Sequence, residues 1–559
     1  MMDAESSVRF EFADDLDDGK AGADAVLRAH APDFAHKKAF VDPPDRIDRG
    51  LGQPRIISYG EADRIADTLC RQFRTCGLGE GDAIAVQAPN TVEAPLLLLG
   101  AWRAGLVPCL LPLHWRFDEI HTAFSQIRPK AAVCVGRYGD DCPAVTLSEA
   151  AARHISIRFV FAFGNELPEG TTPLDDWLKV PDGQDEKAAD GPLAPPDISG
   201  RSAIITWAVR KQGVFPVQRT HGELMALAHL FATRLQLKQS DVVLNTYPLT
   251  GIAAVAGQLV APLLAGSEVV LHLPFNFDVF VDQLEQHGIT YTAVPAPVIT
   301  ALEERREWRS GTLSLNRLGC VWPSPHGVKS SPDLFESSVP IFDIHNFGEL
   351  ALMVRRRSSG QDPSLLPLGR IDASGGDEAS GEAAFETRVR GSVTNEENRQ
   401  QLKGMLFVRG STVPSMPCPV QSSEDRPDLQ PDDHGFLDTG ICCIVDDTIP
   451  GHFRCQKSED VIYHGGAMVA ATELDRIYGE FSEFLDAAAF VLEDEVIGER
   501  IFAAVVPKPE LSPSLVRLKR FLAEKRVAPY KVPDQLVIVK SIPRNGDGTV
   551  LRNQILSQI

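Results

Sequence analysis

The sequence lacks the features that would place it in several large classes of protein. Its first residues, MMDAESSVRFEFADDLDDGK, are acidic and lack the basic and then apolar order of a secretory signal. Its longest apolar runs, around 94–102 and 253–266, are too short or too interrupted to cross a bilayer. A basic excess is also missing, because the formal net charge is −21. We therefore expect a cytoplasmic protein with no membrane span and no nucleic-acid partner.

Paired C-x-x-C motifs are also absent, although the chain has ten cysteines. Scattered cysteines in a large chain without an export signal are typical of reduced thiols. The residue types of a metal site gather only in the group formed by Cys442, Cys443, His452, Cys455 and His464. Its spacing is not that of a structural zinc site, so we predict no metal ion.

The length of 559 residues exceeds what one compact core holds, so we expect at least two domains. Apolar residues at helical spacing in 59–78 and 91–105 alternate with short apolar strands, which predicts parallel sheets and an α/β fold. Near the end the pattern changes to short strands and two amphipathic helices, typical of a small α+β domain. The expected divisions are a mobile or loosely packed acidic extension (1–45), a large domain (46–457) with a surface loop (180–200) and a polar insertion (371–400), and a small lid domain (458–559).

Several motifs occur in an order that resembles one family. They include SYGEAD from Ser58, GMLFVRG, HGFLDTG, GGAMVAATELD and YKVPDQLVIVKSIPRNGDGTVLR, which ends at Arg552. The ordered set resembles the adenylate-forming acyl-CoA synthetases of the AMP-dependent synthetase and ligase superfamily, which also contains luciferase. The resemblance implies a large domain of layered, mostly parallel sheets and helices, and a small mobile α+β C-terminal domain. Members typically activate a carboxylic acid with Mg-ATP and then pass the acyl group to a thiol, and the small domain rotates between the two steps.

The phosphate loop of that family, TSGTTGxPKGV before a Thr-His pair, is altered here. Counted back from Thr220 and His221, the segment reads WAVRKQGVFPV (207–217), without the loop glycines and the lysine in register. Glycines matter in such loops because backbone N–H groups must approach phosphate oxygens closely. Arg210 and Lys211 add positive charge, either as point contacts to phosphate or as solvated surface cations.

Three other nucleotide-binding motifs are also changed. The position of the magnesium-binding acid is Ala351, with Glu349 two residues earlier; in an extended segment, that offset would return Glu349 to the same face. The position of the family's ribose-binding aspartate is occupied by Ile441, and Asp438 lies three residues earlier. The position of the family's adenylation lysine is occupied by Thr549, so no catalytic residue is assigned. The candidate nucleotide-site residues are Arg210, Lys211, Thr220, Gly348, Glu349, Asp438 and Lys457, the last at the place of a family arginine.

The resemblance also implies positions for an acyl pocket, a hinge and a tunnel for the pantetheine arm of CoA. The acyl-pocket candidates are Thr250, Gly251, Trp322, His326, His345 and Phe347. The hinge candidate is Asp460, and the tunnel candidates are Gly465 and Gly466. Each also has an ordinary structural interpretation, since buried aromatics, satisfied histidines and turn glycines are common.

The sequence leads to three hypotheses. The first is a diverged member impaired in ATP-dependent adenylation, which binds an acyl group or a partner, or performs an ATP-independent acyl reaction. The second is a working ATP-dependent ligase that joins an acid to CoA or an amine with relocated charges; only this one requires ATP, magnesium and CoA. The third is a transferase or hydrolase that uses acyl-CoA or an acyl carrier. The expected ligand is a small carboxylic acid or an acyl thioester, and a carrier protein or a biosynthetic enzyme is a further candidate partner.

Overall fold

The computed structural model describes most of the chain, and the ranges that follow define where structural statements apply. They are 21–180, 197–305, 308, 311–322, 339–358, 362–372, 383–396, 399–415, 429–445, 450–464, 466–494 and 498–558. The candidates His326 and Gly465, and most of the expected loop at 180–200, lie outside these residues. Within them, no helix has the length and apolar character needed to cross a membrane.

A seven-stranded sheet forms the first layer, in the order β7-β6-β5-β3-β4-β8-β9. Its strands are parallel up to β8, and β9 returns antiparallel at the edge. Strands β3 to β5 lie almost wholly in the core, which explains their continuous apolar sequence. The strands are β3 (Ala83–Gln87), β4 (Val107–Leu110), β5 (Ala131–Val135), β6 (Phe159–Phe163), β7 (Thr172–Pro173), β8 (Ser202–Arg210) and β9 (Gly213–Thr220), and the helices are α2 (Tyr59–Thr75), α3 (Glu93–Ala104), α4 (Phe117–Ile127) and α5 (Pro143–Ala151).

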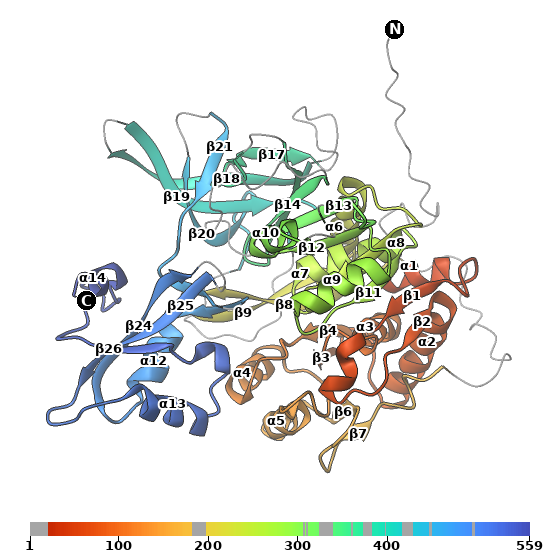
Figure 1. Ribbon diagram of the computed structural model, residues 1–559, viewed down its shortest axis with the longest axis horizontal. Coiled ribbons are helices and arrows are strands. Elements are labelled where there is room, and N and C mark those ends of the chain that lie inside the picture. The colour runs from red at the N-terminus through yellow and green to blue at the C-terminus, as the bar shows by residue number, and fades with distance from the viewer. Residues whose placement is uncertain are drawn as a thin grey trace, which may run out of the picture.

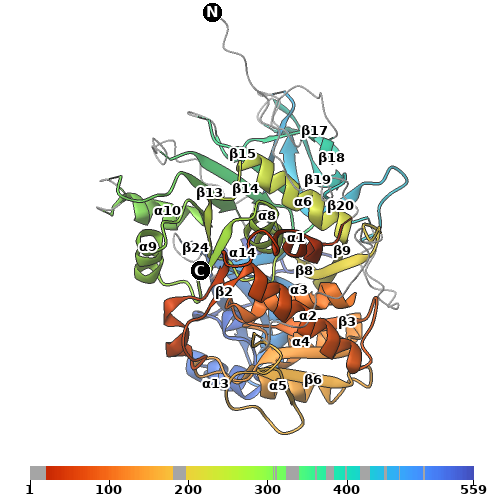
Figure 2. The ribbon, with the colours of Figure 1, turned by 90° about the vertical axis from the view of Figure 1, so that its right-hand side faces the viewer.

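An eight-stranded sheet forms the second layer, in the order β15-β14-β13-β12-β10-β11-β1-β2, and only its two outer pairs are antiparallel. Figure 2 shows helices between and beside the two sheets, where the largest hydrophobic cluster lies. The strands are β1 (Lys38–Val41), β2 (Ile56–Ser58), β10 (Val242–Asn245), β11 (Glu268–Leu271), β12 (Tyr291–Val294), β13 (Arg317–Trp322), β14 (Ile341–Asn346) and β15 (Leu352–Arg356). The helices are α1 (Ala23–His30), η2 (Pro44–Arg49), α6 (His221–Arg234), α7 (Ile252–Ala254), η3 (Val255–Val260), α8 (Ala261–Leu264), α9 (Phe277–Gln286) and α10 (Ala296–Glu303).

The segment 21–45 corrects the expectation of a loosely packed extension that reaches residue 45. Helix α1 buries Val26 and Leu27, and β1 lies between β11 and β2 in the second sheet. Its short apolar run AFV was overlooked because the acidic residues before it dominate the composition of the segment. The large domain therefore includes the described residues from Ala21 onward.

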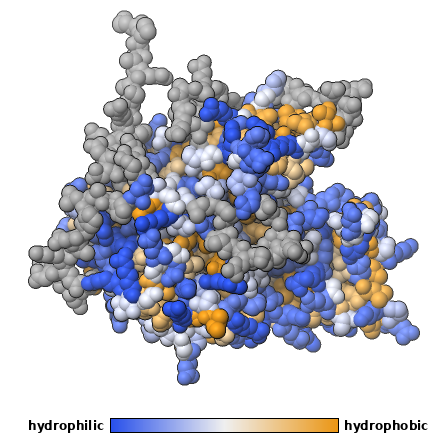
Figure 3. All heavy atoms as spheres, turned by 180° about the vertical axis from the view of Figure 1, so that it is seen from behind, coloured by the Kyte–Doolittle hydropathy of each residue, from blue (hydrophilic) through white to orange (hydrophobic). Residues whose placement is uncertain are grey.

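Two smaller sheets complete the chain (Figure 1). The first is antiparallel and contains β16 (Leu366–Pro367), β17 (Gly369–Asp372), β18 (Ala383–Glu396), β19 (Arg399–Arg409), β20 (Leu437–Val445) and β21 (His452–Cys455). The second belongs to the C-terminal domain, which contains β22 (Val461–His464), β23 (Ala467–Ala470), α12 (Ala471–Gly479), β24 (Phe484–Asp494), β25 (Gly498–Pro507), α13 (Leu515–Glu524), η6 (Pro529–Lys531), β26 (Gln535–Ile538) and α14 (Arg552–Leu556). Seen from behind, the surface is largely hydrophilic, and it is hollowed between the antiparallel sheet and the C-terminal domain (Figure 3).

The polar insertion expected at 371–400 also needs correction, because β18 and the start of β19 fall within it. The two strands pair along their whole length, from Glu386 opposite Arg409 to Glu396 opposite Arg399. The alternation of polar and apolar residues in this long hairpin was hidden by its overall polarity. The α/β architecture with a small α+β domain is nevertheless the predicted one.

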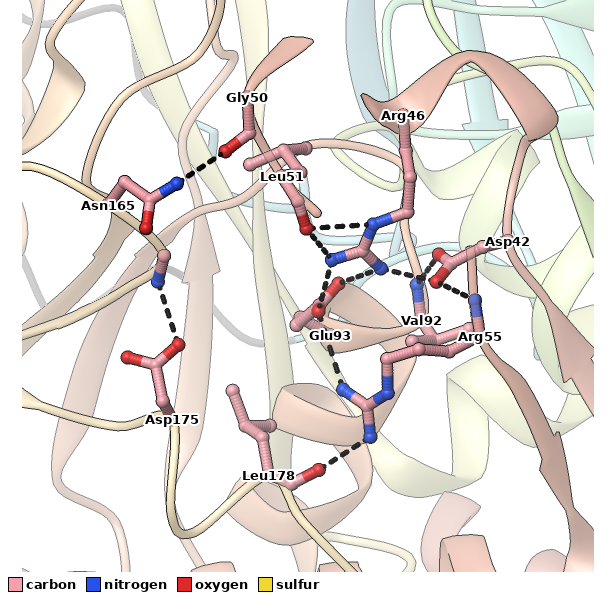
Figure 4. A network of polar contacts seen from close by, with 11 residues as sticks. Asp42, Arg46, Gly50, Leu51, Arg55, Val92, Glu93, Asn165, Asp175 and Leu178 are labelled. Carbon is pink, nitrogen blue, oxygen red and sulfur yellow. Dashed lines mark hydrogen bonds and ion pairs between the residues drawn. The ribbon is translucent and has the colours of Figure 1, made fainter. Parts of the chain in front are cut away.

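A network of four charged side chains connects the two large sheets, and three of them, Asp42, Arg46 and Glu93, are buried (Figure 4). Arg46 forms ion pairs with Asp42, which follows β1, and with Glu93, which begins α3 and lies 2.9 Å away. Arg55 also contacts Glu93, at 3.4 Å, and donates to the carbonyl of Leu178. Burial and the nearby carboxylate of Glu93 raise the pKa of Asp42 to about 6.

We predict that Asp42 makes folding stability fall as pH rises between about 4 and 6. Its folded pKa lies above the unfolded value of 3.8, so the folded state binds the proton more tightly, and this stabilisation is lost as pH passes the folded pKa. The change is up to about 3 kcal/mol. Urea unfolding across this pH range should show a weaker pH dependence for Asp42→Asn. Asp176→Asn, which removes an exposed ion pair with Lys179, should keep the wild-type slope; equal slopes for Asp42→Asn and wild type would contradict the prediction.

Candidate functional site

The segment that aligns with the phosphate loop forms a closed hairpin. Strand β8 pairs with β9 as far as Arg210 opposite Gly213, so only Lys211 and Gln212 form the turn. Successive N–H groups of an extended strand point to opposite sides and do not converge on one anion, as those of a phosphate-binding nest do. The indole of Trp207 donates to the carbonyl of Leu110 at 2.8 Å, which fixes β8 against β4.

Two cations at the turn end of this hairpin, Arg210 and Lys211, are engaged within the protein. Arg210 donates to the backbone carbonyl of Asp438, and its side chain lies beside Gly440. Burial lowers its pKa, so it is not the solvated surface cation of the second interpretation. Lys211 is more exposed and lies 3.6 Å from the carboxylate of Asp460, the hinge candidate.

The segment of Gly348 and Glu349 is a tight turn between β14 and β15, so it is not extended. Both residues have left-handed backbone angles, with φ of 64° and 65°, and the N–H of Leu350 donates to the carbonyl of Phe347. The turn directs the buried carboxylate of Glu349 to the N-terminus of α7, where it accepts from the N–H of Ile252 at 2.8 Å. Its other oxygen accepts from Asn346 at 2.8 Å. An extended segment was the condition under which Glu349 could take the place of the magnesium-binding acid, and the turn does not meet that condition.

Arg219 is a central residue that the sequence reasoning missed. Its side chain is 0% exposed and donates to the carbonyls of Thr412, Glu349 and Leu350 at 2.7–2.8 Å. Burial lowers its pKa to about 10. The available signal was an arginine in a strand that is buried from Phe215 to Thr220. It connects the hairpin, the turn before β15 and the chain after β19.

The remaining nucleotide-site candidates have local partners. Thr220 caps α6 by accepting from the N–H of Glu223, and Asp438 accepts from the N–H of Gly440 at 2.8 Å. Lys457 forms an ion pair at 2.7 Å with Glu499 of the C-terminal domain. One region therefore contains Arg210, Gly348, Glu349 and Asp438. Lys211 and Lys457 instead contact the C-terminal side.

Thr549 lies in a turn of the C-terminal domain. Its N–H donates to the side chain of Asn545 at 2.9 Å, and the adjoining Gly548 has a positive φ. Figure 1 shows the following helix, α14, at the outer end of that domain, away from β8 and β9. The helix that begins three residues after Thr549 is thus remote from the β8–β9 hairpin in this arrangement.

Two of the acyl-pocket candidates are neighbours on adjacent strands. Trp322 on β13 is opposite His345 on β14, and their rings stack with centroids 6.3 Å apart. The indole N–H donates to Asp343 at 2.8 Å. His345 is wholly buried, and neither ring nitrogen has a hydrogen-bond partner in the described part of the chain. Burial lowers its pKa to about 4, so the imidazole is neutral at pH 7.

The other acyl-pocket candidates do not join this pair. Phe347 is buried in the main core and packs against Phe385, with ring centroids 6.4 Å apart. Thr250 lines a narrow apolar pocket between the two large sheets. Gly251 lies beside the carboxylate of Glu349, and a Cβ there would be 3.4 Å from its oxygen.

A buried ion pair docks the C-terminal domain on the large domain. The Nζ of Lys531, whose side chain is 2% exposed, lies 2.5 Å from Glu119 of α4 and 2.5 Å from Glu473 of α12. Burial alone would lower the pKa of Lys531, but the neighbouring acidic groups outweigh it and raise the pKa. The ring of Tyr530 packs edge-on against His114 at 4.7 Å. The motif that begins at Tyr530 did not indicate these acidic partners.

The β22–β23 hairpin extends this contact. Strand β23 lies against β8 and β9, and the hydroxyl of Thr472 donates to the carbonyl of Lys211 at 2.5 Å. The tunnel candidate Gly466 is in the turn of this hairpin with a φ of 82°, and it is exposed. Within the described residues, no group of three or more His, Cys, Asp or Glu side chains is arranged to hold a metal ion.

Comparison with known proteins finds similarity along nearly the whole chain. Residues 27–198 match the family described as AMP-binding enzyme, and residues 473–549 match the AMP-binding enzyme C-terminal domain. The chain is 23% identical over 546 residues to a medium-chain fatty-acid–CoA ligase of Escherichia coli (strain K12), covering 92% of this chain and 89% of the relative. It is 25% identical over 551 residues to a salicyl-AMP ligase/salicyl-S-ArCP synthetase of Mycobacterium tuberculosis, covering 96% and 90%.

Solved structures agree on the fold. An o-succinylbenzoate CoA synthetase from Bacillus subtilis aligns with a TM-score of 0.68 at 16% identity, covering 95% of this chain and 98% of that one. An amide bond synthetase from Marinactinospora thermotolerans aligns with a TM-score of 0.68 at 18% identity, covering 96% and 99%. These matches confirm the resemblance that the ordered motifs indicated.

We predict that Arg219→Met destabilises the protein by roughly 2–4 kcal/mol, because it leaves buried carbonyls without a donor. Arg219→Lys should lose less, since an ammonium group retains part of the hydrogen bonding. The measurement is urea unfolding. Arg517→Met, at an exposed arginine on α13, is the control and should change stability little. Equal stability of Arg219→Met and wild type would refute the role of Arg219.

We also predict that Lys531→Met loosens the C-terminal domain. The buried carboxylate of Glu119 and the partly buried one of Glu473 would lose their shared cation, and breaking a buried pair costs roughly 3–5 kcal/mol. Limited proteolysis should cut the segment 456–460 several times faster than in the wild type. Lys525→Met, which removes an exposed pair with Glu480, should leave the cutting rate nearly unchanged; the same rate in both variants would argue against this docking role.

Proposed function

Because the chain belongs to the AMP-binding, adenylate-forming enzyme superfamily and has both its N-terminal and its C-terminal domain, we propose that it is a diverged member that binds an acyl group or acyl thioester without forming an acyl adenylate. The observation that carries this proposal is the closed β8–β9 hairpin. Adenylation joins two anionic groups, and its transition state needs converging donors and cations. In the hairpin, the strand geometry disperses the donors, and Arg210 is already bound to Asp438.

The magnesium position gives a second argument. The described residues there do not fit the ion: Ala351 is buried and has no oxygen in its side chain, and both oxygens of Glu349 already accept hydrogen bonds. Mg²⁺ needs oxygen ligands in near-octahedral geometry. We therefore assign no reaction step to this ion.

The candidate acyl-pocket residues His345 and Trp322 support the proposal that the protein binds an acyl ligand. A buried polar group without a partner costs about 1–3 kcal/mol, and native proteins hold few of them. His345 is such a group beside the apolar face of Trp322. A neutral imidazole both donates and accepts a hydrogen bond, so it fits the carbonyl, carboxyl or hydroxyl of an acyl ligand.

A second candidate is an ATP-dependent ligase with relocated charges. The observation in its favour is that Arg210, Glu349 and Asp438 come together around the turn at Gly348. In that case the ligand would have to displace Arg210 from the Asp438 carbonyl and Glu349 from Ile252. This candidate predicts that Lys211→Ala and Glu349→Ala each lower turnover strongly.

Titration calorimetry with Mg-ATP separates the two candidates. We expect no saturable heat, no thermal shift and no pyrophosphate exchange with a panel of carboxylic acids. Saturable binding together with exchange would overturn the proposal, and loss of exchange in Glu349→Ala would then support the ligase.

Acyl thioesters test the positive half of the proposal. A panel of acyl-CoA compounds should contain one that raises the melting temperature. His345→Phe should weaken its binding about tenfold, the effect of one lost hydrogen bond. His154→Phe, a change at a half-buried histidine that follows α5 and contacts His121 of α4, is the matched control and should bind as the wild type does. If no acyl-CoA or free acid in the panel binds, acyl binding is refuted.

A further inference from the structure

Two cysteines face each other at the end of the antiparallel sheet before the hinge. Cys443 on β20 is directly opposite Cys455 on β21, and their sulfur atoms lie 3.5 Å apart. Both are free thiols. Cys455 is the last residue of β21, and the chain then runs through Lys457 to Asp460, which contact Glu499 and Lys211.

The register makes this pair suitable for a disulfide. The N–H of Gln456 donates to the carbonyl of Cys442 at 2.7 Å, so 442 and 456 form a hydrogen-bonded pair. Because the two kinds of pair alternate, 443 and 455 form the non-hydrogen-bonded pair, in which the Cα atoms are about 4.5 Å apart and the side chains are closer. That separation lies within the range of disulfides, about 4.4–6.8 Å. A cross-link therefore requires little movement of the strands.

The two thiols differ in access. Cys443 is fully buried, and burial together with Cys455 raises its pKa. Cys455 is half-buried, so it is the sulfur that a small reagent reaches first. The neighbouring Cys442 points to the opposite face of β20, as alternation along a strand requires, and contacts Gln456 instead.

We propose that Cys443 and Cys455 form a redox-active dithiol that a low-molecular-weight disulfide oxidises. The thiolate of Cys455 attacks one sulfur of the reagent and releases one thiolate, which leaves a mixed disulfide on Cys455. The thiolate of Cys443 then attacks the sulfur of Cys455, forms the internal disulfide and releases the second thiolate. The two protons of the cysteines pass to the released thiolates, so the dithiol loses two electrons and the reagent becomes two thiols.

The place of the pair gives the modification a structural consequence. The disulfide joins β20 to the last residue of β21, two residues before Lys457. It therefore cross-links the strand from which the hinge segment leaves the large domain. The step uses neither the nucleotide-site residues nor the acyl-pocket residues, so its test is independent of the proposed function.

The test is treatment of the folded full-length protein with glutathione disulfide, followed by alkylation of the remaining thiols and mass spectrometry. The wild type should carry two alkyl groups fewer than the untreated protein, hold no glutathione on Cys443 or Cys455, and yield a peptide that links 443 to 455. Cys443→Ser should stop at a stable glutathione adduct on Cys455, because the second thiol is missing. Cys455→Ser should acquire no glutathione on the buried Cys443.

Cys442→Ser is the matched control and should form the internal disulfide as the wild type does. Cys443→Ala replaces Cys443→Ser if circular dichroism shows that the serine variant is misfolded. An unchanged number of alkylated thiols in the wild type, a persistent glutathione adduct on its Cys455, or a link that involves Cys442 would each overturn the proposal.

Discussion

The antiparallel pairing of β8 with β9 is the constraint on which the rest of the site depends. Because the strands pair up to a two-residue turn, the segment is extended where the resemblance implied a phosphate-binding loop. Extension directs Arg210 to the Asp438 carbonyl, brings Lys211 toward Asp460, and buries Arg219 under the turn before β15. One local pairing therefore organises contacts with β20, with the hinge and with the C-terminal domain.

The charged side chains that could have served a nucleotide are satisfied internally. A charge removed from water needs a partner, since an unpaired buried ion is strongly unfavourable. Arg219 has three carbonyls, Lys531 has two carboxylates, and Glu349 has a helix N-terminus and an amide. His345 is different, because its nitrogens have no partner among the described residues. Both nitrogens of the His345 imidazole therefore remain available to a ligand.

Much of the fold could be predicted from the sequence, and the errors have specific causes. Helices α2 and α3 and the strands after them were predicted because the apolar periodicity is strong and the helix ends carry a capping box at Ser58 and a glycine at Gly105. The segments 21–45 and 371–400 were predicted wrongly because average polarity hid short buried runs within them. The extended geometry considered for Glu349 is wrong because two successive left-handed residues form a turn.

The sequence by itself determined the superfamily and the two-domain α/β architecture, since ordered motifs and local periodicity are properties of the chain. Only the tertiary structure decided which partners the candidate site residues have. The partners of Arg219, Lys531 and Glu349 are distant in sequence, and the Cys443–Cys455 contact depends on the register between β20 and β21. Such pairings follow from how the strands and domains pack against each other, which a single sequence does not specify locally.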